Sequence, residues 1–173
     1  MPTEFQIGIS LIGLRGIYYS MSDEIKIAIA CSTGGHMVQA KELAKVYEMY
    51  SHFYFTFNGG VADEMRKTTC VYSIPNIVKY NPISWIVGAI LSFYFALKER
   101  PDIVITTGAG IVVFFCVFAK LFGAKLIFIE SMARIERPTL TARMLYPFAD
   151  LFFVQWPALI KFFPKAKYVG RLL

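Results

Sequence analysis

Short apolar runs that end in glycine, proline or a polar residue alternate with helical patterns along most of this chain. Residues 25–31 (IKIAIAC) form a continuous apolar run, broken only by Lys26, and the turn sequence STGG follows at once. A short run without polar alternation is typical of a strand buried on both faces, as in a parallel sheet. The pattern therefore predicts an α/β fold.

The same alternation continues almost to the end of the sequence. It predicts about seven strands, at residues 25–31, 52–57, 70–74, 102–107, 125–130, 151–155 and 168–169. Helices are expected over 36–50, 61–67, 82–98, 111–122, 138–148 and 157–163, with Gly123 as the C-cap of the fourth. Strands joined by helical crossovers form a Rossmann-like parallel sheet with helices on both faces. Because there is no internal repeat or linker, residues 23–173 are expected to form a single domain.

The chain is more apolar than a soluble domain of its size needs to be. Hydrophobic residues make up 56% of its 173 residues and charged residues only 17%, with a mean hydropathy of +0.51, whereas soluble domains carry about a quarter charged residues. The surplus must be buried in a core, a partner or lipid. The net charge of +6 suits an anionic membrane surface or nucleic acid. We expect no nucleic acid, since no basic run is interleaved with aromatic residues.

Pro82–Lys98 (PISWIVGAILSFYFALK) is the segment best suited to contact with lipid. It is apolar on all sides, whereas a surface helix of a soluble domain is apolar on one stripe. It is slightly short for a membrane span, and its aromatic residues Trp85, Phe93, Tyr94 and Phe95 suit the membrane interface. We therefore predict a helix that lies against the membrane surface, with a buried core helix as the alternative.

Residues 1–22 are interpreted as an N-terminal extension. Phe5–Tyr19 is mostly apolar but short for a transmembrane helix, and Arg15 interrupts it. The opening residues lack the basic charge of a signal peptide. Two interpretations stay open: an interfacial anchor, or a stretch that precedes a true start at Met21.

The cysteines and histidines do not suggest a metal site. Cys31, Cys70 and Cys116 lie in apolar runs without a CxxC spacing, which indicates buried free thiols in a reducing compartment. His36 and His52 lie near no cysteine cluster. We expect neither a metal nor a cofactor.

The loop Thr33, Gly34, Gly35 and His36 is the first candidate site. Paired glycines let backbone N–H groups approach an anion, and the start of the following helix adds positive potential, so a phosphate or diphosphate would fit. His36, in the first helical turn, is a candidate base for an attacking hydroxyl. The alternatives are a tight turn without a ligand and a histidine that only packs.

The second candidate loop is Thr107–Gly110. Its two glycines, Gly108 and Gly110, and an acidic residue about 20 positions later, Glu130, resemble a dinucleotide fingerprint. The match is incomplete, because Val113 stands where a third glycine or alanine belongs. A loop that holds a diphosphate without a nicotinamide fits equally well.

Two further strand ends carry candidate residues. After the strand that ends at Glu130, Arg134 is expected either to clamp a phosphate or to form an ion pair with Glu130. Trp156, after another strand, is expected either to stack on a sugar or to fill the rim of the core.

Four segments together resemble one known family: STGGHMVQA (32–40), RPDIVITTGAG (100–110), the stretch 127–156 that begins IFIESMAR and ends FVQW, and KYVG (167–170). They resemble the membrane-anchor subunit of the bipartite UDP-N-acetylglucosamine transferase. That family serves asparagine-linked glycosylation in eukaryotes, and its bacterial relatives serve polysaccharide biosynthesis. It is similar to the N-terminal, acceptor-side half of MurG-type transferases, which have the GT-B fold.

The resemblance implies a subunit of a two-component glycosyltransferase at the cytoplasmic face of a membrane. That membrane would be the plasma membrane in a prokaryote and the endoplasmic reticulum in a eukaryote, and the attachment peripheral or monotopic. The subunit would bind a polyprenyl-diphosphate-linked acceptor and recruit a separate donor-binding subunit, which holds the UDP-sugar as a substrate. The sequence stops where a second Rossmann-like half would begin, so the chain alone is expected to be inactive.

The resemblance also assigns roles to individual residues. Gly34 and Gly35 match the glycine loop that faces the acceptor diphosphate, and His36 matches the proposed base. Gly108 and Gly110 match the second glycine loop of the acceptor side.

Glu130 and Arg134 match the ES-x-AR signature, with acceptor or subunit contact as the implied role.

One departure from the family is the lack of a clear N-terminal transmembrane helix, which leaves anchoring to Pro82–Lys98 and the basic surface. Two rival functions stay open: a dinucleotide-binding oxidoreductase, and a membrane scaffold without a catalytic role.

Overall fold

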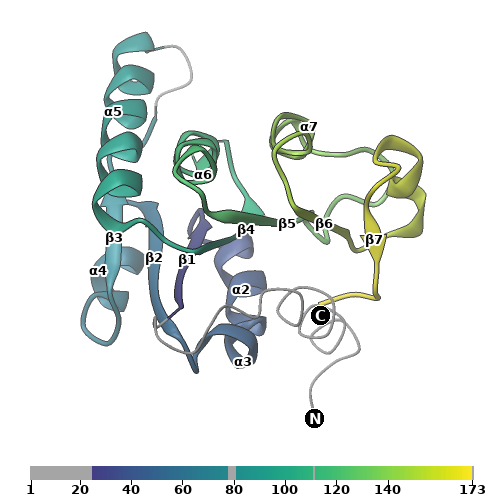
Figure 1. Ribbon diagram of the computed structural model, residues 1–173, viewed down its shortest axis with the longest axis horizontal. Helices are drawn as coiled ribbons and strands as arrows, with labels where there is room; N and C mark the ends of the chain where they lie inside the picture. The colour runs from purple at the N-terminus through teal and green to yellow at the C-terminus, as the bar shows by residue number, and fades with distance from the viewer. Residues whose placement is uncertain (1–24, 78–80, 111, 173) are drawn as a thin grey trace.

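The computed structural model describes residues 25–77, 81–110 and 112–172, which form a seven-stranded parallel sheet (Figure 1). The strand order is β3-β2-β1-β4-β5-β6-β7, and every neighbouring pair is parallel. The predicted Rossmann-like α/β fold is therefore confirmed. The predicted extension over residues 1–22 lies outside the described residues.

The elements follow the predicted alternation. The strands are β1 (Lys26–Cys31), β2 (Ser51–Phe57), β3 (Val71–Ile74), β4 (Ile103–Gly108), β5 (Lys125–Ile129), β6 (Leu151–Val154) and β7 (Lys167–Tyr168). The helices are α2 (Gly35–Glu42), α3 (Ala44–Tyr47), α4 (Gly60–Met65), α5 (Pro82–Glu99), α6 (Val112–Leu121), α7 (Leu140–Leu145) and the 3₁₀ helix η2 (Pro157–Phe162).

Two helices differ most from their predicted bounds. The helix expected over 36–50 is divided into α2 and α3 at Leu43, whose buried side chain packs in the core while its backbone leaves the helical conformation (φ −87°, ψ 4°). The helix expected over 138–148 starts only at Leu140, because Thr139 caps it by accepting a hydrogen bond from the Ala142 N–H.

Helices cover both faces of the sheet. Helices α5, α6 and α7 lie on one face, and α2, α3 and α4 lie on the other (Figure 1). The core under α5 and α6 is rich in aromatic residues, including the stacked rings of Phe55 and Phe115, whose centroids lie 4.1 Å apart. Much of the apolar surplus of the sequence is therefore buried in this layer.

Helix α5 has two different sides, which the sequence did not distinguish. Its small residues Gly88, Ser92 and Ala96 are buried, while larger apolar side chains such as Ile90 are exposed. Phe95 is half-buried and packs against the rings of Phe55 and Tyr72, whereas Phe93 and Tyr94 are exposed. The place of Phe95 at the membrane interface stays a prediction. Among the described residues, no helix has the length and hydropathy needed to cross a bilayer.

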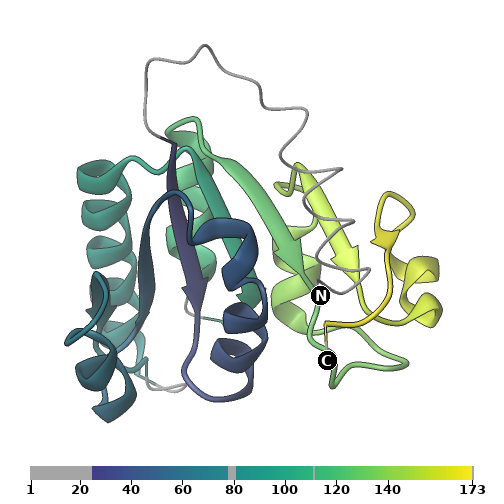
Figure 2. The same cartoon turned by 90° about the horizontal axis from the view of Figure 1, so that it is seen from below.

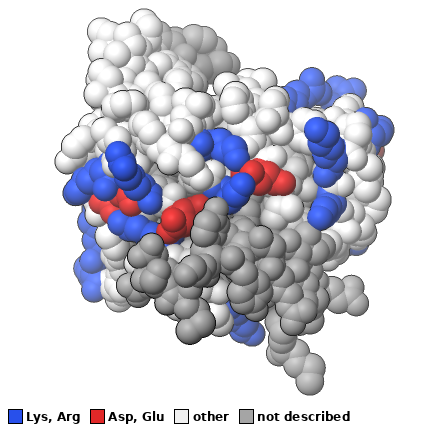
Figure 3. All heavy atoms as spheres, viewed as in Figure 1, with Lys and Arg blue, Asp and Glu red and all other residues white. Residues whose placement is uncertain are grey.

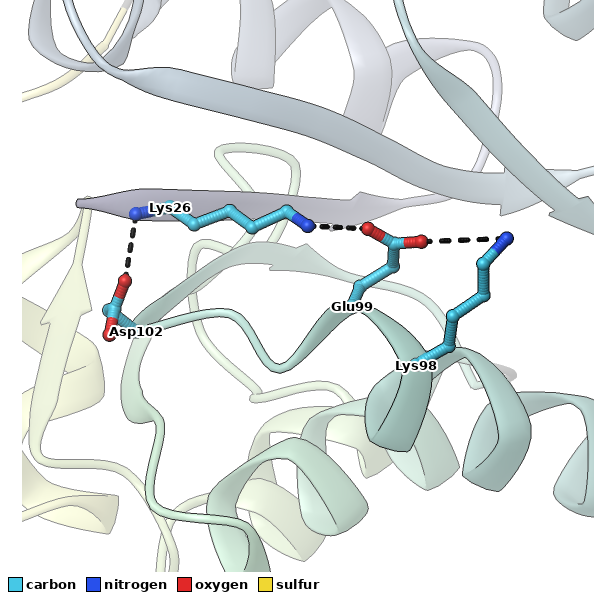
Figure 4. A network of polar contacts seen from close by, with 4 residues as sticks. All are labelled: Lys26, Lys98, Glu99 and Asp102. Atoms are coloured by element: carbon cyan, nitrogen blue, oxygen red, sulfur yellow. Dashed lines mark hydrogen bonds and ion pairs between the residues drawn. The ribbon is translucent and has the colours of Figure 1, made fainter. Parts of the chain in front are cut away.

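A group of charged residues lies at the amino ends of β1 and β4 (Figure 4). The Lys26 ammonium contacts the Glu99 carboxylate at 2.5 Å, and Lys98 lies 3.8 Å from the same carboxylate. The Lys26 backbone N–H donates to Asp102 at 2.8 Å. These contacts fasten the end of α5 to the start of β1.

Two of the three cysteines fit the prediction of buried thiols. Cys31 and Cys116 are fully buried, and burial raises the pKa of both thiols to about 12. Cys70 is exposed, directly before β3 at the outer edge of the sheet, so the prediction is wrong for this residue.

Candidate functional site

The candidate loops meet at one edge of the sheet. Strands β1, β4, β5 and β6 are consecutive neighbours, and their carboxyl ends point to the same edge (Figure 2). The segments that follow these strands begin at Ser32, Ala109, Glu130 and Gln155. Ligands of such sheets bind at the carboxyl edge, which makes it the natural place for a site.

The first loop presents its backbone to the outside. Gly34 has a φ of +86°, a conformation that glycine adopts without strain. Gly34 and Gly35 are exposed, and no described atom lies within 4 Å of where a Cβ would stand at either residue. Helix α2 begins at Gly35, so its first N–H groups find no acceptor within the helix and suit an anion.

His36 is fixed by a pair of contacts with β4. Its Nδ1 lies 2.7 Å from the Thr107 carbonyl oxygen, and the Thr107 hydroxyl donates to the His36 carbonyl oxygen at 2.9 Å. Because a carbonyl oxygen only accepts, the proton must be on Nδ1. In the neutral ring, Nε2 then carries the lone pair, as a general base requires.

Gly108 lies directly beside the His36 ring. Its φ is +98°, and a Cβ at this position would lie 3.5 Å from His36 Cε1. The following residue, Ala109, also has a positive φ, of +126°, and Gly110 is exposed. The structure therefore brings both glycine-containing loops and His36 together.

Glu130 is bonded within the protein. Its side chain is buried, at 1% exposure, and accepts hydrogen bonds from the Ser131 N–H at 2.8 Å and the Thr139 N–H at 3.0 Å. The Thr139 hydroxyl lies 3.1 Å from both carboxylate oxygens. With these donors in place, the carboxylate closes the loop 131–139 onto β5. A contact between Glu130 and an acceptor, a subunit or a ribose stays a prediction.

Arg134 does not form the expected ion pair. It is exposed on the outer part of the loop 131–139, and no ion pair with Glu130 occurs among the described residues. Its backbone N–H donates to the Ser131 carbonyl. A contact between Arg134 and a phosphate stays a prediction.

Trp156 is half-buried and supports the same loop. Its indole N–H donates to the Met132 carbonyl at 2.7 Å. The guanidinium of Arg171 lies 4.3 Å from the centroid of the ring. The ring thus links the loop after β5 to the C-terminal segment.

Sequence reasoning assigned no role to two buried polar residues, Gln39 in α2 and Gln155 after β6. Their side chains are bonded to each other at 2.8 Å. Gln155 directly follows a buried strand, which was the only local signal of its burial. Within the described parts of the chain, no three His, Cys, Asp or Glu side chains are grouped to hold a metal. The expected lack of a metal and a cofactor stays a prediction.

The chain matches the model of a known protein family. A family model described as "Oligosaccharide biosynthesis protein Alg14 like" matches residues 73–172. The chain belongs to this family. The Alg14-like assignment confirms the resemblance inferred from the four sequence segments.

Curated relatives carry the corresponding name. The UDP-N-acetylglucosamine transferase subunit ALG14 of Yarrowia lipolytica is 27% identical over 185 residues, which cover 91% of this chain and 85% of the relative. The human protein of the same name is 36% identical over 89 residues, covering 48% of this chain. That match spans only 41% of the human protein.

Solved structures agree on the fold. MurG of Acinetobacter baumannii is similar to the Alg14-like chain with a TM-score of 0.69 and 17% identity, over 85% of this chain and 45% of MurG. A UDP-N-acetylglucosamine 2-epimerase from Rickettsia bellii gives a TM-score of 0.68 at 10% identity, over 87% of this chain and 46% of the epimerase. The chain thus has the fold of one half of these proteins and spans less than half of their length.

Proposed function

We propose that this chain binds the lipid-diphosphate acceptor for a two-component UDP-N-acetylglucosamine transferase. The observation that carries the proposal is the bond between His36 Nδ1 and the Thr107 carbonyl oxygen. It makes Nε2 the proton acceptor of a ring that lies between two glycine loops. That arrangement suits the activation of a hydroxyl next to a phosphate group.

The reaction needs few groups from this chain. His36 Nε2 takes the proton of the acceptor hydroxyl as its oxygen forms a bond to the anomeric carbon of the donor sugar. The bond between that carbon and the donor phosphate breaks, and UDP leaves. The acceptor diphosphate lies against the exposed backbone of Gly34 and Gly35 at the start of α2.

A separate polypeptide supplies the UDP-sugar site in this proposal. The curated relatives are named as subunits of a transferase, which supports a second component. The name of the relatives makes N-acetylglucosamine the proposed sugar, for oligosaccharide or polysaccharide biosynthesis.

We further propose that α5, α6 and α7 rest on the cytoplasmic face of a membrane. Their outer surface, here called the apolar face, exposes large apolar side chains: Ile83, Ile86, Ile90, Phe93, Tyr94, Leu121, Phe122, Leu140, Met144 and Phe148. The visible surface over the first turns of α5 is uncharged, the exposed Lys98 lies at the C-terminal end of this helix, and basic side chains gather towards the η2 side (Figure 3). An uncharged surface with a basic border suits a bilayer with anionic headgroups.

Reconstitution with the donor-binding polypeptide tests the transferase. The two chains are co-purified and given UDP-N-acetylglucosamine and a polyprenyl-diphosphate-linked acceptor. We expect transfer by the complex and none by either chain alone. Transfer by this chain alone, or binding of a nicotinamide dinucleotide by its glycine loops, would contradict the proposal.

Vesicle flotation tests the apolar face. We expect binding to vesicles with anionic lipids, and loss of that binding in the variant Ile90→Asp/Phe93→Asp, whose residues are 61% and 45% exposed. The control is Met49→Asp, which adds a charge next to α3 on the opposite side of the sheet, where Met49 is 77% exposed. Equal loss in both variants would show that charge alone, and not this face, governs binding.

A further inference from the structure

Two buried glutamines join α2 to the end of β6. Gln39 lies in α2, three residues after His36, and is 6% exposed, while Gln155 directly follows β6 and is 0% exposed. The Gln155 Nε2 donates to the Gln39 Oε1 at 2.8 Å. Buried amides are tolerated only where their polar atoms are bonded, so this pair depends on its partners.

The orientation of both amides is fixed by backbone donors. The Met132 N–H donates to Gln39 Oε1 at 3.0 Å, and the Leu172 N–H donates to Gln155 Oε1 at 2.9 Å. A backbone N–H donates and never accepts, so the atom that faces it must be the amide oxygen Oε1 and not the amide nitrogen Nε2. Neither amide can flip without losing these bonds.

The remaining amide protons reach the proposed site. Gln39 Nε2 lies 3.4 Å from the carbonyl oxygen of Gly35, in the first glycine loop. Gln155 Nε2 donates to the Glu130 carbonyl at 3.0 Å. The pair therefore ties the start of α2 to the loop after β5, to the end of β6 and to the C-terminal segment.

The start of α2 needs such support. Its N-cap is Gly34, which has no side chain to accept a hydrogen bond from the first turn, and the helix ends after only 8 residues. Short helices of this kind depend on tertiary contacts for their position. For the turn that carries His36, those contacts come from Thr107 on one side and from the glutamine pair on the other.

We infer that Gln39 and Gln155 are positioning residues, which hold the Gly35–His36 turn in place for proton transfer from the acceptor. The inference rests on the proposed transferase function, because it concerns the same site. Neither glutamine contacts a substrate in this account, and both act through the backbone of α2. The expected signature is a loss in kcat with little change in the KM for the UDP-sugar.

Kinetics of the reconstituted complex test this role. Gln39→Met and Gln155→Met keep the length of the side chain and remove its hydrogen bonds. We expect each to lower kcat about tenfold, and the double variant to be no worse than the worse single one, because either change breaks the pair. The control is Val46→Ala, a buried residue of α3, the helix after α2, whose complex is expected to keep kcat within about twofold.

A further variant covers the case in which the methionine variants do not fold. Gln39→Glu keeps an acceptor for the Met132 N–H and for Gln155, and replaces the donor to Gly35 with a carboxylate oxygen that faces the Gly35 carbonyl oxygen. We expect it to fold and still to lose kcat, with faster amide hydrogen exchange at residues 35–37.

The outcomes separate the two proposals. A folded Gln39→Glu or Gln39→Met complex that keeps kcat within about twofold of the wild type would overturn the positioning role while leaving the transferase intact. The same holds if Val46→Ala, at equal thermal stability, loses as much kcat. A wild-type complex that transfers no sugar would overturn the proposed function itself, and the positioning role with it.

Discussion

The two ends of the parallel sheet are built in opposite ways. At the amino ends, charged side chains neutralise one another, with Lys26 and Lys98 against Glu99 and with Asp102 on the β1 backbone (Figure 4). At the carboxyl ends of β1 and β4, the groups that follow the strands are exposed glycine backbone and the half-buried ring of His36. The carboxylate that directly follows β5, Glu130, is bonded inward.

This difference shows that charge is a poor guide to the site in this chain. Paired charges at the amino ends satisfy each other and leave nothing for a ligand, so their role is stability. Uncapped backbone N–H groups and an oriented imidazole are less conspicuous in a sequence, but they remain available for chemistry. Substitutions of the paired charges at the amino ends should therefore change stability and leave the transfer rate unchanged. Substitutions of the glycine backbone or of His36 at the carboxyl ends should lower the transfer rate.

The largest expected effect on stability is at Glu130. Glu130→Ala leaves the Ser131 and Thr139 N–H groups without their buried acceptor and should lower the free energy of unfolding by about 3 kcal/mol. Urea denaturation of wild type and Glu130→Ala measures this change in the free energy of unfolding. Glu136→Ala, an exposed acid in the same loop, is the control and should change stability by less than about 0.5 kcal/mol. Equal effects would mean that the bonds of Glu130 do not hold the loop.

Gly108→Ala should affect both stability and the transfer rate. Its φ of +98° strains any residue with a side chain, and the new Cβ would lie 3.5 Å from His36 Cε1. We expect a cost of about 1–2 kcal/mol and a loss of about tenfold or more in the transfer rate of the complex.

Gly123→Ala is the matched control for Gly108→Ala. Gly123, the confirmed C-cap after α6, has a φ of +104° and no described atom near its would-be Cβ. The variant should lose similar stability but keep the transfer rate. If both variants lost the same rate, backbone strain alone would explain the effect, and the contact with His36 would be irrelevant.

The smallest effect is expected at the amino ends of the strands. Burial alone would raise the pKa of Glu99, but the hydrogen bonds from Lys26 and Tyr72 outweigh it and hold this pKa below its usual range. The contribution of Glu99 is therefore present at neutral pH and lost as pH falls through its lowered pKa. Glu99→Gln should cost about 1 kcal/mol at pH 7 and leave transfer unchanged.

Thermal unfolding across pH checks this sign. The difference in stability between wild type and Glu99→Gln should shrink as the solution becomes acidic. Two results would contradict a purely structural role for the amino ends. One is a stability difference between wild type and Glu99→Gln that grows in acid, and the other is slower transfer by the Glu99→Gln complex at neutral pH.

The sequence predicted what local patterns encode. Continuous apolar runs identified the strands, and Gly123 marked the end of α6 because its backbone requires a positive φ. The glycine loop before His36 was found because paired glycines let backbone N–H groups approach an anion. These features depend on residues within a few positions of one another.

Features that depend on distant partners were not predictable. The Gln39–Gln155 bond joins residues 116 positions apart, and the Gln39–Met132 bond spans 93. Nothing near Glu130 in the sequence indicates that Thr139 occupies its carboxylate. Such contacts form only when the sheet brings its loops to one edge. The hydrogen bonds of Gln39, Gln155 and Glu130 were therefore not predictable from the sequence.

The most direct test compares the two histidines of the chain. Both place Nδ1 against a backbone carbonyl, His36 at 2.7 Å from Thr107 and His52 at 3.0 Å from Tyr50, but only His36 lies at the carboxyl edge. The transfer rates of complexes with His36→Gln and with His52→Gln are measured at equal subunit stoichiometry. The account predicts a loss of about 100-fold or more for His36→Gln and a rate within about twofold of wild type for His52→Gln. Equal rates for both would contradict it and leave the chain as a scaffold for its partner.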